Sequence, residues 1–280
     1  MNCTTLFAVY KDQPPSEVFA DYYYHGQDGE TWEKPYEQIA KMAKPEEWSF
    51  NREEFQKPNV NFPILQSYLK YTFLRLQQEG KIAITPDGKG ACFNTGLVSG
   101  DEKEIFAVFE EHKRKDEGFA AWFLAGFFDS YAQRMSLFRP LPEMAQYIDD
   151  ASDLVFDISY EVDINVGHML DDEQNRERLP PELQENRTLA LQAIEGAVKL
   201  ITRKILRNYK TAIPMWYLQK DKIQLLLPLY LTRQDEADLA LVADKDKEGR
   251  LYRIRTALTM DQAYINARLL TRPDREWLNP

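Results

Sequence analysis

The stretch that decides the fold is Ile205-Leu206-Arg207-Asn208-Tyr209-Lys210-Thr211-Ala212-Ile213-Pro214. Upstream of it, apolar residues recur at alternating spacings of three and four, which predicts an amphipathic helix over about 181–207. These residues are Leu191, Ile194, Val198, Ile201 and Ile205. Downstream, apolar runs of strand length follow. The stretch is therefore predicted to be a junction where a long helix ends in cationic side chains and a series of strands begins.

Four strands are predicted after this junction, at 212–217, 223–231, 239–243 and 252–256. The turn Asp246-Lys247-Glu248-Gly249 favours an antiparallel hairpin between the last two. A closing helix is predicted at 261–270, with Thr259 or Asp261 as its N-cap. Two further strands are predicted before the long helix, at 154–158 and 162–164. The expected C-terminal domain, 151–280, is thus α+β with a helix and an antiparallel four-stranded sheet.

The first half of the chain predicts a second α+β region, over 46–150. A stripe of Leu65, Leu69, Phe73 and Leu76 indicates a helix at 64–79, and a hairpin is predicted from 81–85 and 91–93. A helix followed by a hairpin is typical of a winged-helix-like unit. Its nucleic-acid contacts would be Lys70, Arg75, Lys81 and Lys89, and the alternative is that these charges form a solvated face. Residues 1–45, broken by prolines, are expected to form an N-terminal arm or capping segment.

Composition and charge restrict the class of protein. The net charge of -10 and pI near 5.0 argue against a broad surface for duplex DNA, because such binding neutralises many phosphates. Cys3 and Cys92 are the only cysteines, so neither a disulfide framework nor a zinc motif is indicated. No long apolar run or signal-peptide pattern is found. We expect a cytoplasmic protein with no membrane partner, no metal and no cofactor.

Candidate site residues surround the junction and are of the types that bind phosphate. Guanidinium and ammonium groups recognise phosphate, and amides bind base edges or ribose hydroxyls. In this hypothesis His168 transfers a proton, and Arg207 and Lys210 clamp the phosphate. The substrate-binding candidates are Asn165, Arg176, Arg203, Asn208, Tyr209, Lys222 and Gln224. The prediction is an RNA- or nucleotide-phosphate-binding protein, with metal-independent phosphodiester cleavage as its enzymatic form.

Simpler explanations exist for the same residues. Cations in the last turn of a helix interact favourably with the helix dipole, by about 0.3–1 kcal/mol each when exposed. The three histidines, at 25, 112 and 168, have no metal-binding spacing, and no Walker, GxGxxG, HExxH or GxSxG motif occurs. The functional alternatives are a non-enzymatic nucleic-acid-binding or protein-interaction regulator and a small-molecule nucleotide sensor. Substrate identity and oligomeric state stay open.

Several sequence blocks carry a family resemblance. They are LQSYLKYTF at 65–73, FNTGL at 93–97, RNYKTAIP at 207–214, LLLPL at 225–229 and DQAYINARL at 261–269. Together they resemble an uncharacterised bacterial domain family of unknown function, over about 46–278. Its relatives occur near or fused to LOTUS-type RNA-binding domains, which implies a connection with RNA. The order of helix, four strands and helix is also similar to the barnase–EndoU–colicin–RelE ribonucleases, an architectural likeness that transfers no catalytic residue.

Overall fold

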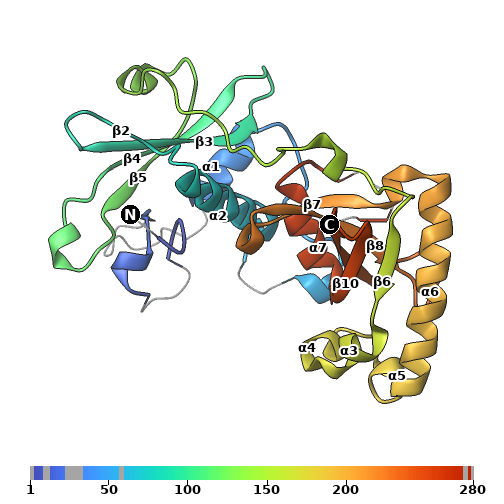
Figure 1. Cartoon of the computed structure of the whole chain (residues 1–280). Coiled ribbons are helices and arrows are strands. Elements are labelled where there is room, and N and C mark those ends of the chain that lie inside the picture. The colour runs from blue at the N-terminus through green and yellow to red at the C-terminus, as the bar shows by residue number, and fades with distance from the viewer. Residues whose placement is uncertain (1–2, 9–12, 23–33, 57–59, 274–276, 279–280) are drawn as a thin grey trace. The chain divides into compact units, whose positions relative to one another are not determined.

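The computed structural model describes the chain except for residues 1–2, 9–12, 23–33, 57–59, 274–276 and 279–280. Its contacts divide the chain into two compact units, Met1–Gln146 and Tyr147–Pro280, called unit 1 and unit 2 below. Each unit is an α+β fold built on its own five-stranded sheet (Figure 1). None of the helices in the described ranges combines the length and apolar character that crossing a lipid bilayer requires.

Unit 1 contains one mixed sheet with strand order β1-β5-β4-β3-β2. The strands are β1 Ala20–Asp21, β2 Ala83–Ile84, β3 Gly90–Val98, β4 Glu104–Glu111 and β5 Trp122–Asp129. The helices are α1 Lys34–Met42 and α2 Pro63–Gln78, with short 3-10 turns η1 Pro15–Glu17, η2 Glu53–Phe55, η3 Lys115–Glu117 and η4 Gln133–Leu137. Among these named strands, β1 pairs with β5 in parallel and the other pairs are antiparallel. The expected helix and hairpin are present, as α2 and as β2 with β3.

The structure does not confirm a winged helix in unit 1. The β2–β3 hairpin is continued by β4 and β5 into a larger sheet, so it is the edge of that sheet rather than a separate wing. The segment 1–45, expected to be an arm or cap, supplies β1 and the buried side chains of Leu6 and Phe19. Residues 23–33 of that segment lie outside the described residues.

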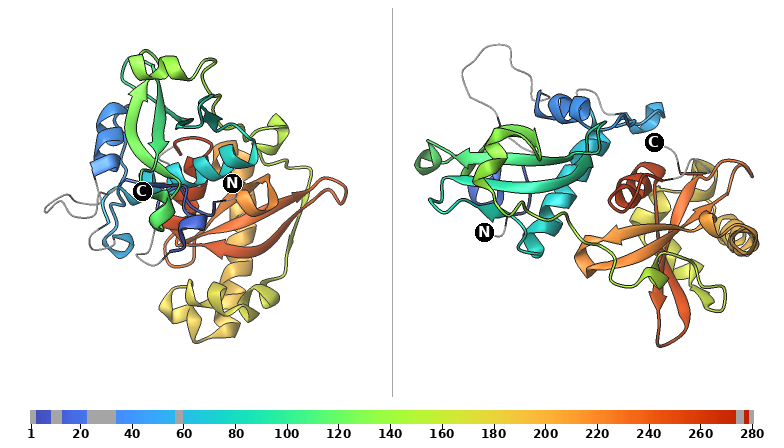
Figure 2. Two further views of the ribbon diagram at one scale, coloured as in Figure 1. Left: turned by 90° about the vertical axis from the view of Figure 1, so that its left-hand side faces the viewer. Right: turned by 90° about the horizontal axis from the view of Figure 1, so that it is seen from above.

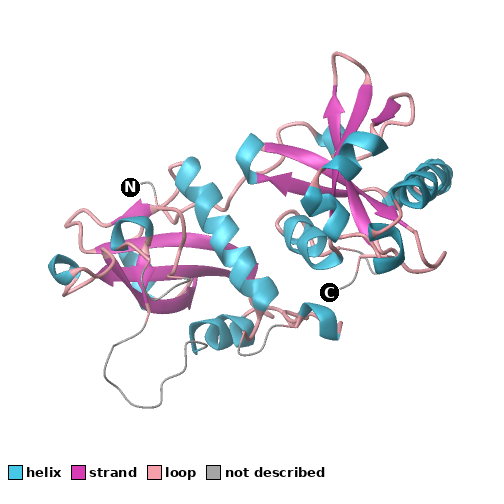
Figure 3. Cartoon of the chain, turned by 90° about the horizontal axis from the view of Figure 1, so that it is seen from below, coloured by secondary structure: helices cyan, strands magenta, loops and turns pink. Residues whose placement is uncertain are grey.

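Aromatic side chains join α2 to the sheet of unit 1, and Figure 3 shows this helix beside the strands. Phe73 of α2 is fully buried, with its ring centroid 5.9 Å from that of Phe93 on β3 and 4.8 Å from that of Phe19. Phe109 of β4 lies 5.6 Å from Phe93 and 5.1 Å from Phe19. These separations are typical of packed aromatic pairs. The apolar stripe of α2 therefore faces the core, as its spacing predicts.

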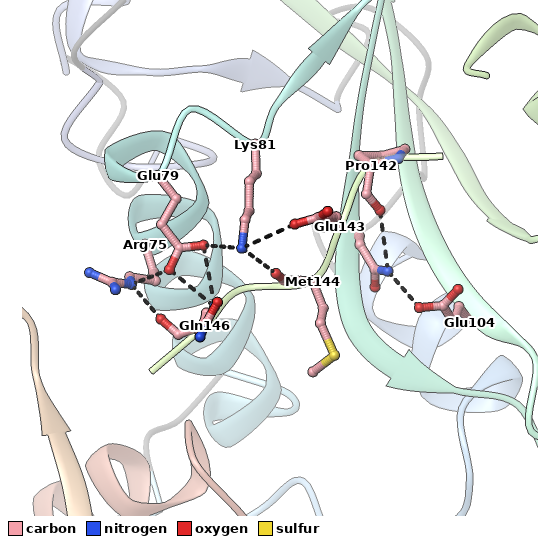
Figure 4. A network of polar contacts seen from close by, with 9 residues as sticks. Arg75, Glu79, Lys81, Glu104, Pro142, Glu143, Met144 and Gln146 are labelled. Carbon is pink, nitrogen blue, oxygen red and sulfur yellow. Dashed lines mark hydrogen bonds and ion pairs between the residues drawn. The ribbon is translucent and has the colours of Figure 1, made fainter. Parts of the chain in front are cut away.

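Charged groups at the C-terminal end of α2 hold the last segment of unit 1 (Figure 4). Glu79 lies 2.6 Å from the Arg75 Nε and 3.0 Å from the Lys81 Nζ, and it accepts from the Gln146 main-chain N–H at 3.0 Å. Arg75 Nε donates to the Gln146 carbonyl at 2.9 Å, and Lys81 Nζ donates to the Met144 carbonyl at 3.1 Å. Arg75 and Lys81, expected to be exposed nucleic-acid contacts, thus have a structural role.

Unit 2 contains a second mixed sheet with strand order β6-β10-β9-β8-β7. Its strands are β6 Glu161–Ile164, β7 Ile213–Tyr217, β8 Lys222–Leu229, β9 Leu239–Asp246 and β10 Leu251–Leu258. The four strands predicted after the junction are β7 to β10, and they pair in antiparallel order. The expected four-stranded sheet is extended by β6, which pairs parallel to β10.

The strand predicted at 154–158 is absent, and the segment forms a covering turn instead. Phe156 stacks on Tyr252 of β10 with ring centroids 4.2 Å apart, and the Asp157 main-chain N–H donates to the Tyr252 hydroxyl at 2.8 Å. The Asp157 side chain also accepts from the Ser159 N–H at 2.9 Å, which favours a turn. Of the apolar residues that suggested a strand, Phe156 is buried by this packing, whereas Val155 and Ile158 are 44% and 66% exposed. Strand pairing is therefore not needed to bury Phe156.

Helices cover both faces of the sheet of unit 2. They are α3 Val166–Asp171, α4 Glu173–Glu177, α5 Pro181–Gln184, α6 Arg187–Arg207 and α7 Met260–Arg268, with 3-10 turns η5 Ala151–Asp153, η6 Tyr209–Thr211 and η7 Leu218–Lys220. The single helix predicted over 181–207 is divided, because Asn186 caps α6 by accepting from the Leu189 N–H at 3.0 Å. The right-hand view of Figure 2 shows α6 and α7 on opposite sides of the sheet.

Replacing Phe73 with alanine should lower the free energy of unfolding by about 3–5 kcal/mol, because a fully buried ring is lost and a cavity is left. Urea unfolding followed by circular dichroism measures the change. Tyr131→Ala is the matched control, since that ring is 80% exposed and should cost less than about 0.5 kcal/mol. Equal effects of the two substitutions would contradict the packing of α2 described above.

Replacing Glu79 with alanine should destabilise the chain by about 3 kcal/mol, because Arg75 stays largely buried without its carboxylate. The segment before Gln146 should also become more sensitive to limited proteolysis. Glu117→Ala removes an exposed ion pair with Arg114 and should cost less than about 1 kcal/mol. A Glu79 variant as stable and as resistant as the Glu117 variant would show that the network is not structural.

Candidate ligand-binding site

The sheet of unit 2 has one face that is buried by apolar packing and one that is partly polar. Leu225 and Leu227 of β8 and Ala243 of β9 belong to the core that includes Ile194 and Ile201 of α6. Side chains alternate between the faces of a strand, so the residues between these project to the opposite face. Helix α7 contacts this second face mainly at β7. Its remaining part is available to form a site.

A cavity of about 560 Å³ lies on this second face of unit 2. Its floor includes Met215, Gln224, Asp244 and Arg253, one from each of β7, β8, β9 and β10. Other lining residues come from α4 and the turn before it, from η7 and from Asn266 of α7. The volume is in the range typical of small-molecule sites. Unit 2 therefore has a polar, concave surface large enough for a nucleotide-sized ligand.

Gln224 is the unusual residue of this cavity, since it is only 6% exposed. Its side-chain amide makes no hydrogen bond with any described residue of the chain, although an amide has two N–H donors and an acceptor oxygen. The amide is not among the fully buried, unpaired side-chain atoms of the described residues, so it faces the open cavity, where solvent can reach it. The amide of Gln224 is therefore available to a guest in the cavity.

The cavity carries excess positive charge within an acidic chain. Arg178, Lys220, Arg253 and Arg255 line it, against the carboxylates of Asp172 and Asp244. Arg253 lies 2.6 Å from Asp246, and Arg255 lies 2.5 Å from Asp163. The main-chain N–H of Gly249, and to a lesser extent Arg253, lower the pKa of Asp246. Lys220 lies 3.7 Å from Asp244, so each of these three cations has a carboxylate partner, and among the described residues Arg178 is the lining cation left to favour an anionic ligand.

Arg178 differs from the other cations of the cavity, because no carboxylate in the described ranges pairs with it. Its Nη1 donates to the Ala257 carbonyl at 2.6 Å and lies 3.4 Å from the Asn175 Oδ1. These contacts fix one guanidinium nitrogen. The remaining N–H donors form no hydrogen bond within the described residues and can bind a phosphate or carboxylate.

Asn175 of α4 attaches the wall of the cavity to its floor. It is 3% exposed, and its Oδ1 accepts from the Thr256 hydroxyl at 2.8 Å and from the Ala257 N–H at 3.3 Å. Its Nδ2 donates to the Arg255 carbonyl at 3.4 Å. The β9–β10 register shifts at these residues, so Asn175 satisfies the backbone of a β-bulge. The bulge and α4 are thereby held in one arrangement.

The candidate residues predicted from the sequence are not gathered around one cavity. Asn165 caps α3 by accepting from the His168 N–H at 3.0 Å, and both residues are exposed. This part of α3 lies beside the start of α6, where Arg187 donates to the Gly167 carbonyl at 3.0 Å. Arg176 of α4 is exposed and is not among the cavity residues. His168 is therefore placed near the N-terminal end of α6.

The junction residues lie at the other end of the same helix. They are Arg203, Arg207, Asn208, Tyr209 and Lys210. Asn208 ends α6, and its Oδ1 accepts from the Lys210 N–H at 3.1 Å. The helix has 21 residues, and with a rise of about 1.5 Å per residue its ends are about 30 Å apart. His168 and the expected phosphate clamp are thus separated by roughly the length of α6.

Two of the predicted residues, Lys222 and Gln224, lie on the polar face of β8. Gln224 lines the cavity, and Lys222 forms an ion pair with Asp244. The sequence analysis did not identify Tyr217, Asp244 or Arg253 as site residues. These residues could have been found from the alternation of polar and apolar side chains along each strand. That alternation shows which residues share a face of the sheet only when the strand register is known.

Comparison with known proteins gives a family but no activity. No curated protein and no solved structure matches the chain. The comparisons supply no link to LOTUS-type RNA-binding proteins or to the barnase–EndoU–colicin–RelE ribonucleases. A family model described as "Domain of unknown function (DUF3825)" matches residues 39–277, and the chain belongs to that family.

Proposed function

We propose that unit 2 binds a phosphate-bearing nucleotide, free or within RNA, in the cavity on the polar face of its sheet. The observation that carries the proposal is the amide of Gln224, which has no partner among the described residues and faces a cavity that four cations and two carboxylates line. An amide can bind a base edge or a sugar hydroxyl, and guanidinium groups bind phosphate. A nucleotide offers both kinds of group at a separation of a few ångströms, which suits a cavity of about 560 Å³.

The charged and neutral residues of the cavity would bind different parts of such a ligand. Arg178, which has no carboxylate partner among the described residues, is the primary phosphate ligand. Gln224 on the floor receives the neutral part of the ligand, because its uncharged amide offers both donors and an acceptor toward the cavity. The Tyr217 ring also lines the cavity and offers apolar surface to a base.

The junction at Arg207 and Lys210 remains a rival location for the phosphate. Both side chains are exposed, and neither is among the cavity residues. His168, the proposed proton-transfer residue, is also exposed and outside the cavity lining. Binding in the cavity needs neither the clamp nor the histidine. We therefore propose binding as the function and assign no reaction to it.

Replacing Gln224 with methionine should weaken nucleotide binding about tenfold while leaving the melting temperature of the free protein nearly unchanged. The ligand loses a hydrogen bond worth about 1.4 kcal/mol, whereas in the free protein the amide has no partner among the described residues to lose. Calorimetry with the 5′-nucleoside monophosphates and with a short single-stranded RNA measures the affinity. Thermal unfolding without ligand measures the stability, and a loss of affinity with unchanged stability would identify Gln224 as a ligand-binding group.

The paired variant Arg207→Ala with Lys210→Ala is the control for location. Binding in the cavity predicts unchanged affinity for this variant, because both residues lie outside the lining. Loss of binding in the paired variant together with normal binding by Gln224→Met would place the ligand at the junction and refute the cavity. Incubation of the RNA with wild-type protein and His168→Ala in chelator separately tests for cleavage.

A further inference from the structure

The two carboxylates that line the cavity are engaged in different ways. Asp172 caps α4, and its Oδ1 accepts from the N–H groups of Gln174 at 2.9 Å and Asn175 at 3.3 Å. Asp244 accepts no main-chain hydrogen bond from the described residues; its Oδ1 pairs with the ammonium of Lys222, and its Oδ2 lies 3.7 Å from the Lys220 Nζ. A carboxylate can accept about four hydrogen bonds. Asp244 therefore keeps acceptor capacity toward the cavity while both lysines contact its carboxylate.

Asp244 and Gln224 are neighbours on the floor of the cavity. Leu225 of β8 pairs with Ala243 of β9 in an antiparallel register, so the preceding residue of β8 lies beside the following residue of β9. Directly opposite side chains in such a pair have Cβ atoms about 4.5–5.5 Å apart. Both residues line the cavity. A ligand on the floor thus meets an amide and a charged carboxylate side by side.

This inference rests on the proposed function and names the base that the nucleotide carries. We propose that the cavity recognises guanine, with Asp244 accepting hydrogen bonds from N1–H and the N2 amino group. The adjacent amide N–H of Gln224 donates to O6. The match depends on two neighbouring donors followed by one acceptor along the edge of the base. Guanine has this order, and the carboxylate and amide of the floor provide its complement.

The other common bases fit this pair of side chains less well. Adenine, cytosine and uracil each present a single donor position on the pairing edge, flanked by ring nitrogen or carbonyl acceptors. Placing such an acceptor opposite the Asp244 carboxylate would set two lone pairs against each other without a proton between them. The same carboxylate that attracts guanine therefore discriminates against the other three bases.

The remaining walls are consistent with a base held between apolar and charged groups. Met215 and the Tyr217 ring line the cavity from β7, where they provide polarizable and aromatic contact surface. The Tyr217 hydroxyl donates to the Gln219 Oε1 at 2.6 Å, which fixes the ring. Arg178 lies on the α4 side and supplies the cation for the phosphate.

The test compares guanosine 5′-monophosphate with inosine and adenosine 5′-monophosphates by calorimetry on the full chain. Inosine lacks only the N2 amino group, so its monophosphate should bind at least about tenfold more weakly. In Asp244→Asn this difference should fall below about threefold. Xanthosine 5′-monophosphate has a carbonyl at that position and should bind Asp244→Asn more tightly than it binds the wild-type protein. A short RNA containing one guanosine or one inosine distinguishes an RNA ligand from a free nucleotide.

Two further variants separate recognition from stability. Asp246→Asn changes a carboxylate on the same strand that is paired with Arg253 and is not among the cavity residues, so it should leave the preference unchanged. Lys222→Met removes one of the two lysines that contact Asp244 but keeps the carboxylate and Lys220, and it should retain a preference for guanine. If the Asp244 variant is unstable, the inosine comparison on wild-type protein still decides the question.

The outcomes distinguish this inference from the proposed function. Monophosphates of guanosine, inosine and adenosine that bind within about threefold of one another would overturn guanine recognition and leave nucleotide binding in place. An undiminished guanosine preference in Asp244→Asn would also overturn the assigned contact. Absence of binding by every nucleotide and RNA would overturn both proposals.

Discussion

The apolar face that α6 buries determines where the polar chemistry of unit 2 lies. Ile194 and Ile201 must be removed from water, and Leu225 and Leu227 of β8 cover them. Strand geometry then directs the alternate residues to the opposite face, including Gln224. The amide occupies the cavity because hydrophobic packing on the other side fixes the register of the sheet. A shift of one residue in β8 would exchange Gln224 with a leucine and destroy both faces.

Unit 1 uses buried charge in a different way. Glu79 accepts from two cations and one main-chain N–H, so its loss of hydration is offset by several directed contacts. These contacts order a segment that has little regular secondary structure before Gln146. Arg75 and Lys81, which the sequence suggested as nucleic-acid contacts, thereby stabilise the fold instead. In unit 2 the comparable group is Arg178, which keeps donors available to a ligand.

Much of the fold could be predicted from periodicity, but the site could not. The spacing of apolar residues identified α2, α6 and the strands β7 to β10, and sequence blocks identified a family of unknown function. The segment 154–158 was wrongly predicted as a strand, because Phe156 is equally well buried by stacking on Tyr252. The cavity depends on cross-strand neighbours such as Gln224 and Asp244, which are 20 positions apart and meet only through register. The cationic residues that are close together in the sequence lie at the junction after α6, so the sequence favoured that location for the site.

The hydrogen bond from the Ala257 N–H to the Asn175 side chain connects the β-bulge of β10 to α4, a helix of five residues. Such a short helix has little stability of its own, so its folding depends on this attachment. Local opening of α4 would expose the Ala257 amide to solvent and separate Arg178 from the floor at the same moment. The rate at which this one proton exchanges with deuterium therefore reports how often the empty protein loses its binding geometry, and a guest bridging wall and floor would slow it.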